Sequence, residues 1–328
     1  MPDSKPTRNL GLELVRVTEA GALGAARLMG RGDKEAGDQA AVDAMRLILN
    51  SIDMDGVIVI GEGEKDEAPM LFNGEHVGRG VPPEVDIAVD PVEGTTPLAE
   101  GRTNSIATVA IAPRGTMYDP GPFLYMDKIA VGPACKGVVD IEAPVADNLR
   151  AIAKALDKRE EDVTVVILDR PRHKDLIAEI RAYGARIRLI SDGDVAGSLM
   201  ACLPETGIDV LMGIGGTPEG VLSACAMRAL GGELQGKLYP RNDDELHRGI
   251  DMGYDFQKVL CLDDLVSSND VFFAATGITD GELLQGVKYL SHGARTDSLV
   301  MRGLTGTIRQ IVATHQFDKL ELISGDRY

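Results

Sequence analysis

The chain has 328 residues, 44% of them apolar and 4% aromatic, and its 34 basic and 51 acidic residues give a formal net charge of −17. This acidity repels nucleic-acid backbones and anionic lipid surfaces, and the few aromatic rings disfavour a protein that stacks bases. We therefore expect a protein that binds neither nucleic acid nor membrane, with a length that suits two lobes or one large α/β domain.

The cysteines and the N-terminal sequence bear on the compartment. The polar start MPDSKPTRNL has no apolar stretch typical of a signal peptide, and no apolar run approaches the roughly 18 residues of a membrane span. The cysteines form no C-x-x-C pair, so we interpret them as reduced core residues of a cytoplasmic protein: Cys135, Cys202, Cys225 and Cys261.

Two helices are predicted near the start of the chain. Residues 10–30 carry apolar positions at helical spacing, and after a loop at 30–38 a second helix is expected to run to about Asn50. Asp38 would lie in the first turn of this second helix. A carboxylate there is stabilised by the positive end of the helix, so a structural role and a functional role both remain open for Asp38.

The middle of the chain predicts a sheet with crossover helices. Residues 162–232 alternate strand, helix, strand, helix, strand and helix, an order that favours parallel pairing. The last of these helices is expected to have Thr217 as its N-cap and Pro218 as its first residue. Residues 240–258 are polar and predict an exposed excursion. Further strands are predicted at 57–60, 85–90, 105–112, 271–277, 298–302 and 307–315.

Carboxylates recur where the predicted strands end: Glu62, Glu64, Asp90, Glu93, Asp192, Asp194 and Glu219. Each alone has a simple explanation, because acidic residues are common in loops and Asp192 or Asp194 could cap the next helix. Strand ends meet at one edge of a parallel sheet, where several carboxylates would repel one another unless cations lay between them. Oxygen ligands suit Mg²⁺ or Mn²⁺, and the histidines show no zinc-binding pattern.

The most specific motif is D-P-V-E-G-T at residues 90–95. The proline restricts Asp90 to an extended conformation, and Gly94 allows a tight turn, so Glu93 can face the same pocket as Asp90. Thr95 would offer a hydroxyl beside two carboxylates, which could orient a water molecule for attack on phosphorus. Other enzyme signatures are missing from the sequence: neither a dinucleotide-binding nor a P-loop glycine pattern occurs, nor a serine-hydrolase elbow.

At this motif the chain resembles the lithium-sensitive phosphatase superfamily, and further motifs narrow the resemblance to class II fructose-1,6-bisphosphatases. It covers roughly residues 10–315, so that chance is a poor explanation. The motifs that carry it are GRGDK at 30–34, IGEGE at 60–64, DEAPM at 66–70, DRPRH at 169–173, SDGDVA at 191–196, GIGGTPEG at 213–220 and ATGITDG at 275–281.

The resemblance implies a role for each matching position. The divalent-metal ligands would be Asp38, Glu62, Asp90, Glu93 and Glu219. Thr95 would position the attacking water, with Asp66 and Lys34 also needed for activity. The substrate would contact Glu93, Gly94, Thr95, Tyr125, Arg170, Pro171, Arg172, Asp192, Gly193, Asp194 and Gly216.

Some of these roles also follow from residue chemistry. A bisphosphate needs a second phosphate pocket, and Arg170 and Arg172 could bind that phosphate through bidentate hydrogen bonds. The alternative for both arginines is a solvated basic loop. Asp192 and Asp194 suit sugar hydroxyls, whereas Tyr125 alone would be read as a core or interface residue.

The resemblance implies hydrolysis of the 1-phosphate of fructose 1,6-bisphosphate, giving fructose 6-phosphate in gluconeogenesis, with Mn²⁺ or Mg²⁺ as cofactor. The alternative is a bifunctional enzyme that also accepts sedoheptulose 1,7-bisphosphate. An inositol-phosphate phosphatase would not need the second phosphate clamp, and a non-catalytic regulator would be expected to lack Thr95 or a carboxylate.

The resemblance also implies the architecture, an α/β fold with α-β-α-β-α layers and two mixed sheets. A metal-binding catalytic lobe is expected over residues 1–155 and a substrate-binding lobe over 156–328, with the C-terminal strands free to return to the first lobe. A homo-oligomer, either dimer or tetramer, is expected as well.

Overall fold

The two N-terminal helices form a layer on one face of the first sheet. The computed structural model describes residues 9–61 and 71–319, beginning with α1 (Gly11–Ala26) and α2 (Lys34–Leu49). The helices pack closely because α1 carries Gly24 at their crossing, where a Cβ atom would lie 2.7 Å from the Ala40 carbonyl oxygen. The helix α2 begins four residues before Asp38, with Asp33 as its N-cap accepting a hydrogen bond from the Ala36 amide.

The first sheet combines strands from both ends of the chain. Within the described residues it has eight strands, of which β1 and β3 run parallel and the other neighbours antiparallel. Its order is β12 (Lys288–Leu290), β13 (Gly293–Arg302), β11 (Phe272–Gly277), β4 (Ile106–Pro113), β3 (Glu84–Glu93), β1 (Asp55–Ile60) and β2 (His76–Val77), with β14 (Thr307–Gln316) on the other edge of β13.

The second sheet is built mostly from the middle of the chain. In the described ranges it has six strands, ordered β10 (Leu260–Cys261), β9 (Glu233–Leu238), β5 (Tyr125–Val131), β8 (Val210–Gly216), β6 (Thr164–Leu168) and β7 (Arg186–Ile190). The strands β6, β7 and β8 pair in parallel, joined by α5 (Lys174–Tyr183) and α6 (Asp194–Cys202). The pairs β5–β8, β5–β9 and β9–β10 are antiparallel.

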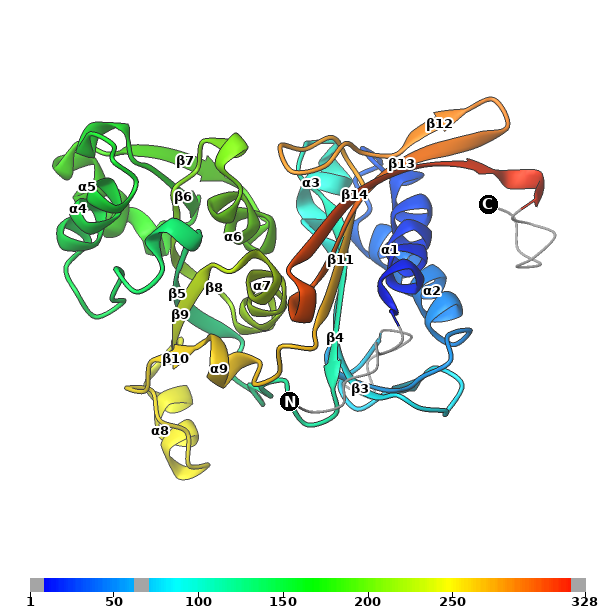
Figure 1. Ribbon diagram of the computed structural model, residues 1–328, viewed down its shortest axis with the longest axis horizontal. Helices are drawn as coiled ribbons and strands as arrows, with labels where there is room; N and C mark the ends of the chain where they lie inside the picture. Colours follow the sequence, from blue (N-terminus) through cyan, green and yellow to red (C-terminus); the bar gives the residue numbers. More distant parts are fainter. Residues whose placement is uncertain (1–8, 62–70, 320–328) are drawn as a thin grey trace.

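Helices separate and cover the sheets, so that five layers follow one another (Figure 1). The helices α6 and α7 (Thr217–Leu230) lie between the two sheets, α1 and α2 cover the far face of the first, and α4 (Val145–Ala155) and α5 cover the far face of the second. Three apolar cores fill the spaces between these layers. The remaining helices are α3 (Thr95–Glu100), α8 (Asp243–Asp251) and α9 (Leu262–Leu265), with 3₁₀ turns η1 (Pro133–Cys135), η2 (Glu160–Asp162), η3 (Pro171–His173), η4 (Pro204–Thr206) and η5 (Gly303–Thr305).

The layered α/β fold with two mixed sheets is therefore confirmed, as is the parallel pairing within residues 162–232. Two details of the helix starts were wrong. Asp38 lies in the second turn of α2 instead of the first, because Asp33 caps that helix. The N-cap of α7 is Gly216, and Thr217 is its first helical residue and makes no capping hydrogen bond.

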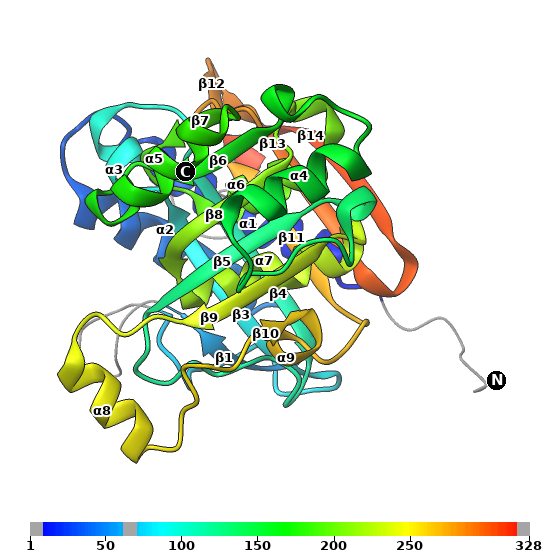
Figure 2. The same ribbon diagram turned by 90° about the vertical axis from the view of Figure 1, so that its left-hand side faces the viewer.

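The polar excursion at 240–258 contains α8, which projects from the body of the molecule (Figure 2). Three cysteines are buried, but Cys261 is exposed, so the core interpretation was wrong for that residue. No helix in the described part of the chain is long and apolar enough to cross a membrane. The division into lobes at residues 155 and 156 stays a prediction. This boundary does not separate the two sheets, since β5 precedes it but belongs to the second sheet, and β11 follows it but belongs to the first.

Candidate active site

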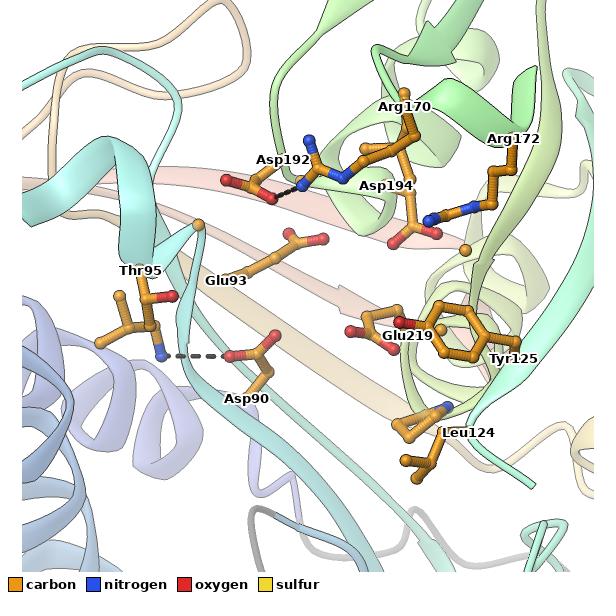
Figure 3. A pocket seen from close by; sticks show the side chains of 17 residues that line it. Asp90, Glu93, Thr95, Leu124, Tyr125, Arg170, Arg172, Asp192, Asp194 and Glu219 are labelled. Atoms are coloured by element: carbon orange, nitrogen blue, oxygen red, sulfur yellow. Dashed lines mark hydrogen bonds and ion pairs between the residues drawn. The ribbon is translucent and has the colours of Figure 1, made fainter. Parts of the chain in front are cut away.

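A pocket of about 400 Å³ opens between the two sheets, where turns from both of them meet (Figure 3). Its walls combine carboxylates, two arginines and backbone from glycine-rich turns. The lining residues are Asp90, Val92, Glu93, Gly94, Thr95, Leu124, Tyr125, Leu168, Arg170, Arg172, Asp192, Gly193, Asp194, Gly215, Gly216, Pro218 and Glu219.

The first sheet contributes the turn from β3 to α3. The register of β3 against β4 shifts between Asp90 and Glu93, and the Asp90 carboxylate accepts a hydrogen bond of 3.1 Å from the Val92 amide. Gly94 follows with φ of 94°, a left-handed conformation that side chains disfavour, and it caps α3 so that Thr95 begins the helix. Asp90, Glu93 and Thr95 consequently face one pocket from a single short segment (Figure 3).

The second sheet contributes an equivalent turn from β7 to α6. Gly193 has φ of 93° and ψ of 56°, close to the 94° and 54° of Gly94, and it also stands as the N-cap of a helix. The two turns meet, because the Glu93 carboxylate accepts hydrogen bonds from the amides of Val195 and Ala196 in the first turn of α6, at 2.5 and 3.3 Å. A carboxylate of one sheet thus caps a helix that packs on the other.

Three carboxylates of the pocket, Asp90, Glu93 and Glu219, are here called the acidic cluster. Figure 3 shows them converging on the same part of the pocket. Burial raises the pKa of Asp90 well above its ordinary value, and the negative charges of Glu93 and Glu219 raise it further. Burial and the charge of Asp194 likewise raise the pKa of Glu93, against the effect of the Val195 amide.

Glu219 completes the cluster from the first turn of α7. Burial and then the charge of Asp194 raise its pKa, while the charge of Lys128 opposes them. Its position depends on Gly216, where a Cβ atom would lie 1.6 Å from Glu219 Oε2. Among the described residues nothing donates a hydrogen bond to this buried oxygen.

The acidic cluster is not drawn together at metal-ligand distances. Within residues 9–61 and 71–319, no three side chains of the His, Cys, Asp and Glu types are grouped so as to hold a metal ion. The chemistry of the cluster nevertheless fits a divalent cation. Buried carboxylates repel one another, and Glu219 Oε2 has an unused acceptor that a hard cation such as Mg²⁺ or Mn²⁺ would satisfy.

The opposite wall of the pocket is basic. Arg170 pairs with Asp192, and Arg172 donates two hydrogen bonds to the Ile214 carbonyl, at 3.0 and 2.8 Å. The Arg172 guanidinium also lies 5.2 Å from the centre of the Tyr125 ring. Both arginines are therefore held by protein contacts and still line the pocket.

The remaining expected residues lie around this pocket. Asp38 is buried in α2, and its charge adds to the raised pKa of Asp90. Lys34 is exposed at the start of α2 and donates a 2.7 Å hydrogen bond to Thr96 Oγ1, next to Thr95. Pro171 begins η3 between the two arginines and does not line the pocket. Glu62 and Asp66 lie outside the described residues.

Several pocket residues were missed by the sequence analysis: Val92, Leu124, Leu168, Gly215 and Pro218. Leu124 precedes β5, a strand that was not predicted because residues 125–131 mix polar and apolar positions. Gly215 stands inside the motif GIGGTPEG, of which only Gly216 and Glu219 were assigned to the site from the sequence. The buried Lys128 behind the pocket was missed together with its strand.

Comparison with known proteins gives consistent matches over nearly the whole chain. The family model described as "Bacterial fructose-1,6-bisphosphatase, glpX-encoded" matches residues 8–315. The protein named "Fructose-1,6-bisphosphatase 1 class 2" of Escherichia coli is 47% identical over 325 residues, covering 95% of this chain and 96% of that protein. The "Fructose-1,6-bisphosphatase class 2" of Shigella flexneri matches to the same extent.

A solved structure, an extragenic suppressor from Pyrococcus furiosus, matches 58% of this chain and 68% of its own, with a TM-score of 0.31 and 11% identity. At this TM-score the match does not establish a shared fold.

Proposed function

The chain belongs to the family of glpX-encoded bacterial fructose-1,6-bisphosphatases, and we propose on this premise that it hydrolyses the 1-phosphate of fructose 1,6-bisphosphate. The products are fructose 6-phosphate and inorganic phosphate, as in gluconeogenesis. The observation that carries the proposal is the pocket itself, with an acidic cluster on one wall and two fixed arginines on the other. With a divalent cation in the acidic cluster, both walls would attract phosphate, which suits a sugar with a phosphate at each end.

The acidic cluster would hold the cofactor, a divalent cation. Asp90, Glu93 and Glu219 supply carboxylates from the described chain, and Asp38, whose charge raises the pKa of Asp90, is proposed as a further ligand. Glu62 is proposed as a further ligand by the resemblance alone. When bound, the cation supplies Lewis acidity to the phosphate group and offsets the charge of the cluster. Mg²⁺ and Mn²⁺ both prefer such oxygen ligands.

The side chains of the chain itself orient the reactants. Thr95 lines the pocket beside the acidic cluster, where its hydroxyl would hold the attacking water in line with the scissile bond. The water forms a new bond to phosphorus while the bond from phosphorus to the oxygen on C1 breaks. One proton leaves the water, and one is taken up by the C1 oxygen, which becomes the sugar hydroxyl.

The basic wall of the pocket would bind the rest of the substrate. Arg170 and Arg172 would bind the 6-phosphate by charge-assisted hydrogen bonds, with Tyr125 supporting Arg172 from one side. Asp192 and Asp194 would accept hydrogen bonds from sugar hydroxyls, and the backbone of Gly193 and Gly216 allows the sugar to approach. The named relatives carry the fructose 1,6-bisphosphate activity in their names, which supports this substrate over sedoheptulose 1,7-bisphosphate.

The compartment and the number of subunits are proposed alongside. Action in the cytoplasm would keep Cys135, Cys202 and Cys225 reduced, in line with their burial as free thiols. A homo-oligomer would cover β14, which pairs only with β13 among the described strands and leaves Ile308 and Val312 exposed. Light scattering on the purified protein measures the number of subunits directly.

The function is tested by phosphate release with fructose 1,6-bisphosphate, sedoheptulose 1,7-bisphosphate and inositol 1-phosphate in parallel, with Mn²⁺, Mg²⁺ or chelator present. Fructose 1,6-bisphosphate should be hydrolysed fastest, and only with metal. Thr95→Ala should lower kcat by about 10²–10⁴-fold, the usual contribution of a group that positions or activates the reacting water. Thr103→Ala, an exposed threonine in the same region of the chain, is the matched control.

Hydrolysis that is unaffected both by chelator and by Thr95→Ala would refute the mechanism. The absence of phosphate release from all three substrates would refute the proposed activity and favour a binding protein.

A further inference from the structure

A lysine side chain is buried directly behind the pocket. Lys128 lies in the middle of β5, and its side chain is 0% exposed. An ammonium group without partners is strongly disfavoured at such a position, because burial removes its hydration. The buried position of Lys128 therefore requires a negative charge and hydrogen-bond acceptors close to its ammonium group.

Both acceptors of Lys128 belong to the pocket wall. Its Nζ atom lies 2.5 Å from Asp194 Oδ2 and 2.8 Å from the Gly216 carbonyl oxygen. Asp194 begins α6, Gly216 ends β8, and both residues line the pocket. A single buried cation thus links a helix start and a strand end that are 22 residues apart in the chain and adjacent in the pocket.

The backbone at Gly215 lies close against the paired side chains of Lys128 and Asp194. A Cβ atom at Gly215 would lie 1.8 Å from Asp194 Oδ2 and 3.0 Å from Lys128 Nζ. The glycine at 215 is therefore a condition for the contact between the lysine and the aspartate. Asp194 is itself 5% exposed, so its carboxylate has few other positions available.

The geometry points to Lys128 as a positioning residue of the active site. We propose that it holds the Asp194 carboxylate and the Gly216 carbonyl in the arrangement that receives the sugar of a sugar phosphate, and that it does so without touching the substrate. This inference rests on the proposed function. It adds a residue that neither the sequence motifs nor the resemblance assigned.

A purely structural role is the competing explanation, and a second buried carboxylate that pairs with a lysine provides the control for it. Lys158 lies 2.5 Å from the buried carboxylate of Asp209, which also accepts a hydrogen bond from the Thr164 amide. The Lys158 side chain is 37% exposed, and neither residue of this pair lines the pocket. Loss of either lysine leaves a buried carboxylate unpaired, whereas only loss of Lys128 should alter substrate binding.

The test compares Lys128→Met, Lys158→Met, Asp194→Asn and the double variant Lys128→Met/Asp194→Asn. The KM for fructose 1,6-bisphosphate is measured well below each melting temperature, and calorimetry gives the Kd of fructose 6-phosphate for the metal-free proteins. Lys128→Met should raise both constants by about 10- to 100-fold, the effect of a misplaced binding group. Lys158→Met should lower the melting temperature and leave both constants within about two-fold of the wild type.

The double variant shows whether Lys128 acts through Asp194. Its constants should match those of Asp194→Asn, because residues that act as one unit are not additive. Constants in Lys128→Met that equal those of the wild type, or losses that multiply in the double variant, would overturn the proposal. If Lys128→Met does not fold, the comparison of Asp194→Asn with the double variant decides the question.

Failure of the proposed function gives a different result, namely a wild type that releases no phosphate. The role of Lys128 is then read from crystal structures of the wild type and of Lys128→Met, in which the Asp194 carboxylate should move away from its wild-type position once the contact with Lys128 Nζ is lost. A carboxylate that stays within about 0.5 Å of its wild-type position, the tolerance of a preorganised site, would contradict the inference.

Discussion

The two turns that meet in the pocket have nearly the same backbone but balance their charges differently. Gly94 and Gly193 adopt almost identical left-handed conformations, and each places acidic residues beside a helix start. On the second-sheet turn, Asp192 pairs with Arg170 and Asp194 pairs with Lys128. On the first-sheet turn, no lysine or arginine pairs with Asp90 or Glu93 within the described residues.

This difference shows that the same local turn can serve two purposes. On the second-sheet turn, a lysine or arginine neutralises each carboxylate, so that no cation from outside the chain is needed. These carboxylates are held in place and can accept hydrogen bonds from a ligand. Where carboxylates face one another without a cation, their charge must be offset from outside the chain, which is what a divalent metal does. The experiments below change one side at a time.

Among the changes that test this comparison, Asp90→Asn should have the largest effect, because it removes one charge from the acidic cluster. The asparagine keeps an acceptor for the Val92 amide but no longer repels Glu93 and Glu219. We expect kcat/KM to fall by about 10²- to 10³-fold, the range seen when one electrostatically stabilising group is lost. The metal-free protein should nevertheless melt a few degrees higher, because a buried and repelled charge has been removed. Phosphate release and thermal unfolding in chelator measure the two effects.

Asp86→Asn is the control on the same strand. Asp86 is also buried, but its carboxylate accepts hydrogen bonds from the amides of Thr116 and Met117 and lies 3.6 Å from Arg114. Its neutralisation should destabilise the protein by roughly 1–3 kcal/mol, since satisfied hydrogen bonds to a charge are lost. If Asp90→Asn lowers the metal-free melting temperature as Asp86→Asn does, the inference that the acidic cluster needs a cation from outside the chain is wrong.

A smaller effect is expected from Arg172→Ala on the basic wall. The guanidinium is fixed by the Ile214 carbonyl and the Tyr125 ring, so it is preorganised for a phosphate that does not react. The KM for fructose 1,6-bisphosphate should rise about 10- to 100-fold, and kcat should change less. Arg172→Lys keeps the charge but not the two-pronged contact, so its KM should fall between those of the alanine variant and the wild type.

Steady-state kinetics with each arginine variant checks this expectation. A fall in kcat with an unchanged KM would instead assign Arg172 to the reacting phosphate and would remove the distinction between the two walls.

The sequence predicted those parts of the site that depend on local patterns. The motif at 90–95 indicated Asp90, Glu93 and Thr95 through a proline, a glycine and a strand end, all within six residues. The alternation over 162–232 likewise predicted parallel strands, which brought Arg170 and Asp192 to one edge. Both patterns are read over short stretches of chain.

Contacts between distant segments could not be predicted in this way. Glu93 caps a helix that begins 101 residues later, and Lys128 finds its partner in Asp194, 66 residues away. A lone lysine in a strand is expected to be exposed, so nothing in residues 125–131 indicated a buried pair. Local rules also competed at helix starts, where Gly216 instead of Thr217 became the cap of α7.

The smallest expected effect concerns His173, which joins the basic wall to its sheet. Its ring is buried, with Nδ1 2.6 Å from the Leu168 carbonyl oxygen and Nε2 accepting a 2.8 Å hydrogen bond from the Ile214 amide. These contacts require a neutral ring, and burial lowers the pKa of His173 below its ordinary value of 6.5. The folded protein therefore binds a proton less readily than the unfolded chain, and this contribution to stability is present above pH 6.5 and is lost as the pH falls below it.

Urea unfolding at pH 7, 6 and 5, in chelator, tests this coupling with His173→Asn. Asparagine can still donate to the Leu168 carbonyl but offers no titrating ring, so the variant should be less stable at pH 7 and lose less stability on acidification than the wild type. His76→Asn, at a site where the side chain is 73% exposed, should retain the wild-type slope. Equal slopes in the wild type and His173→Asn would mean that the contact holding the Ile214 carbonyl under Arg172 does not depend on a neutral His173, and that the basic wall is fixed by the arginine alone.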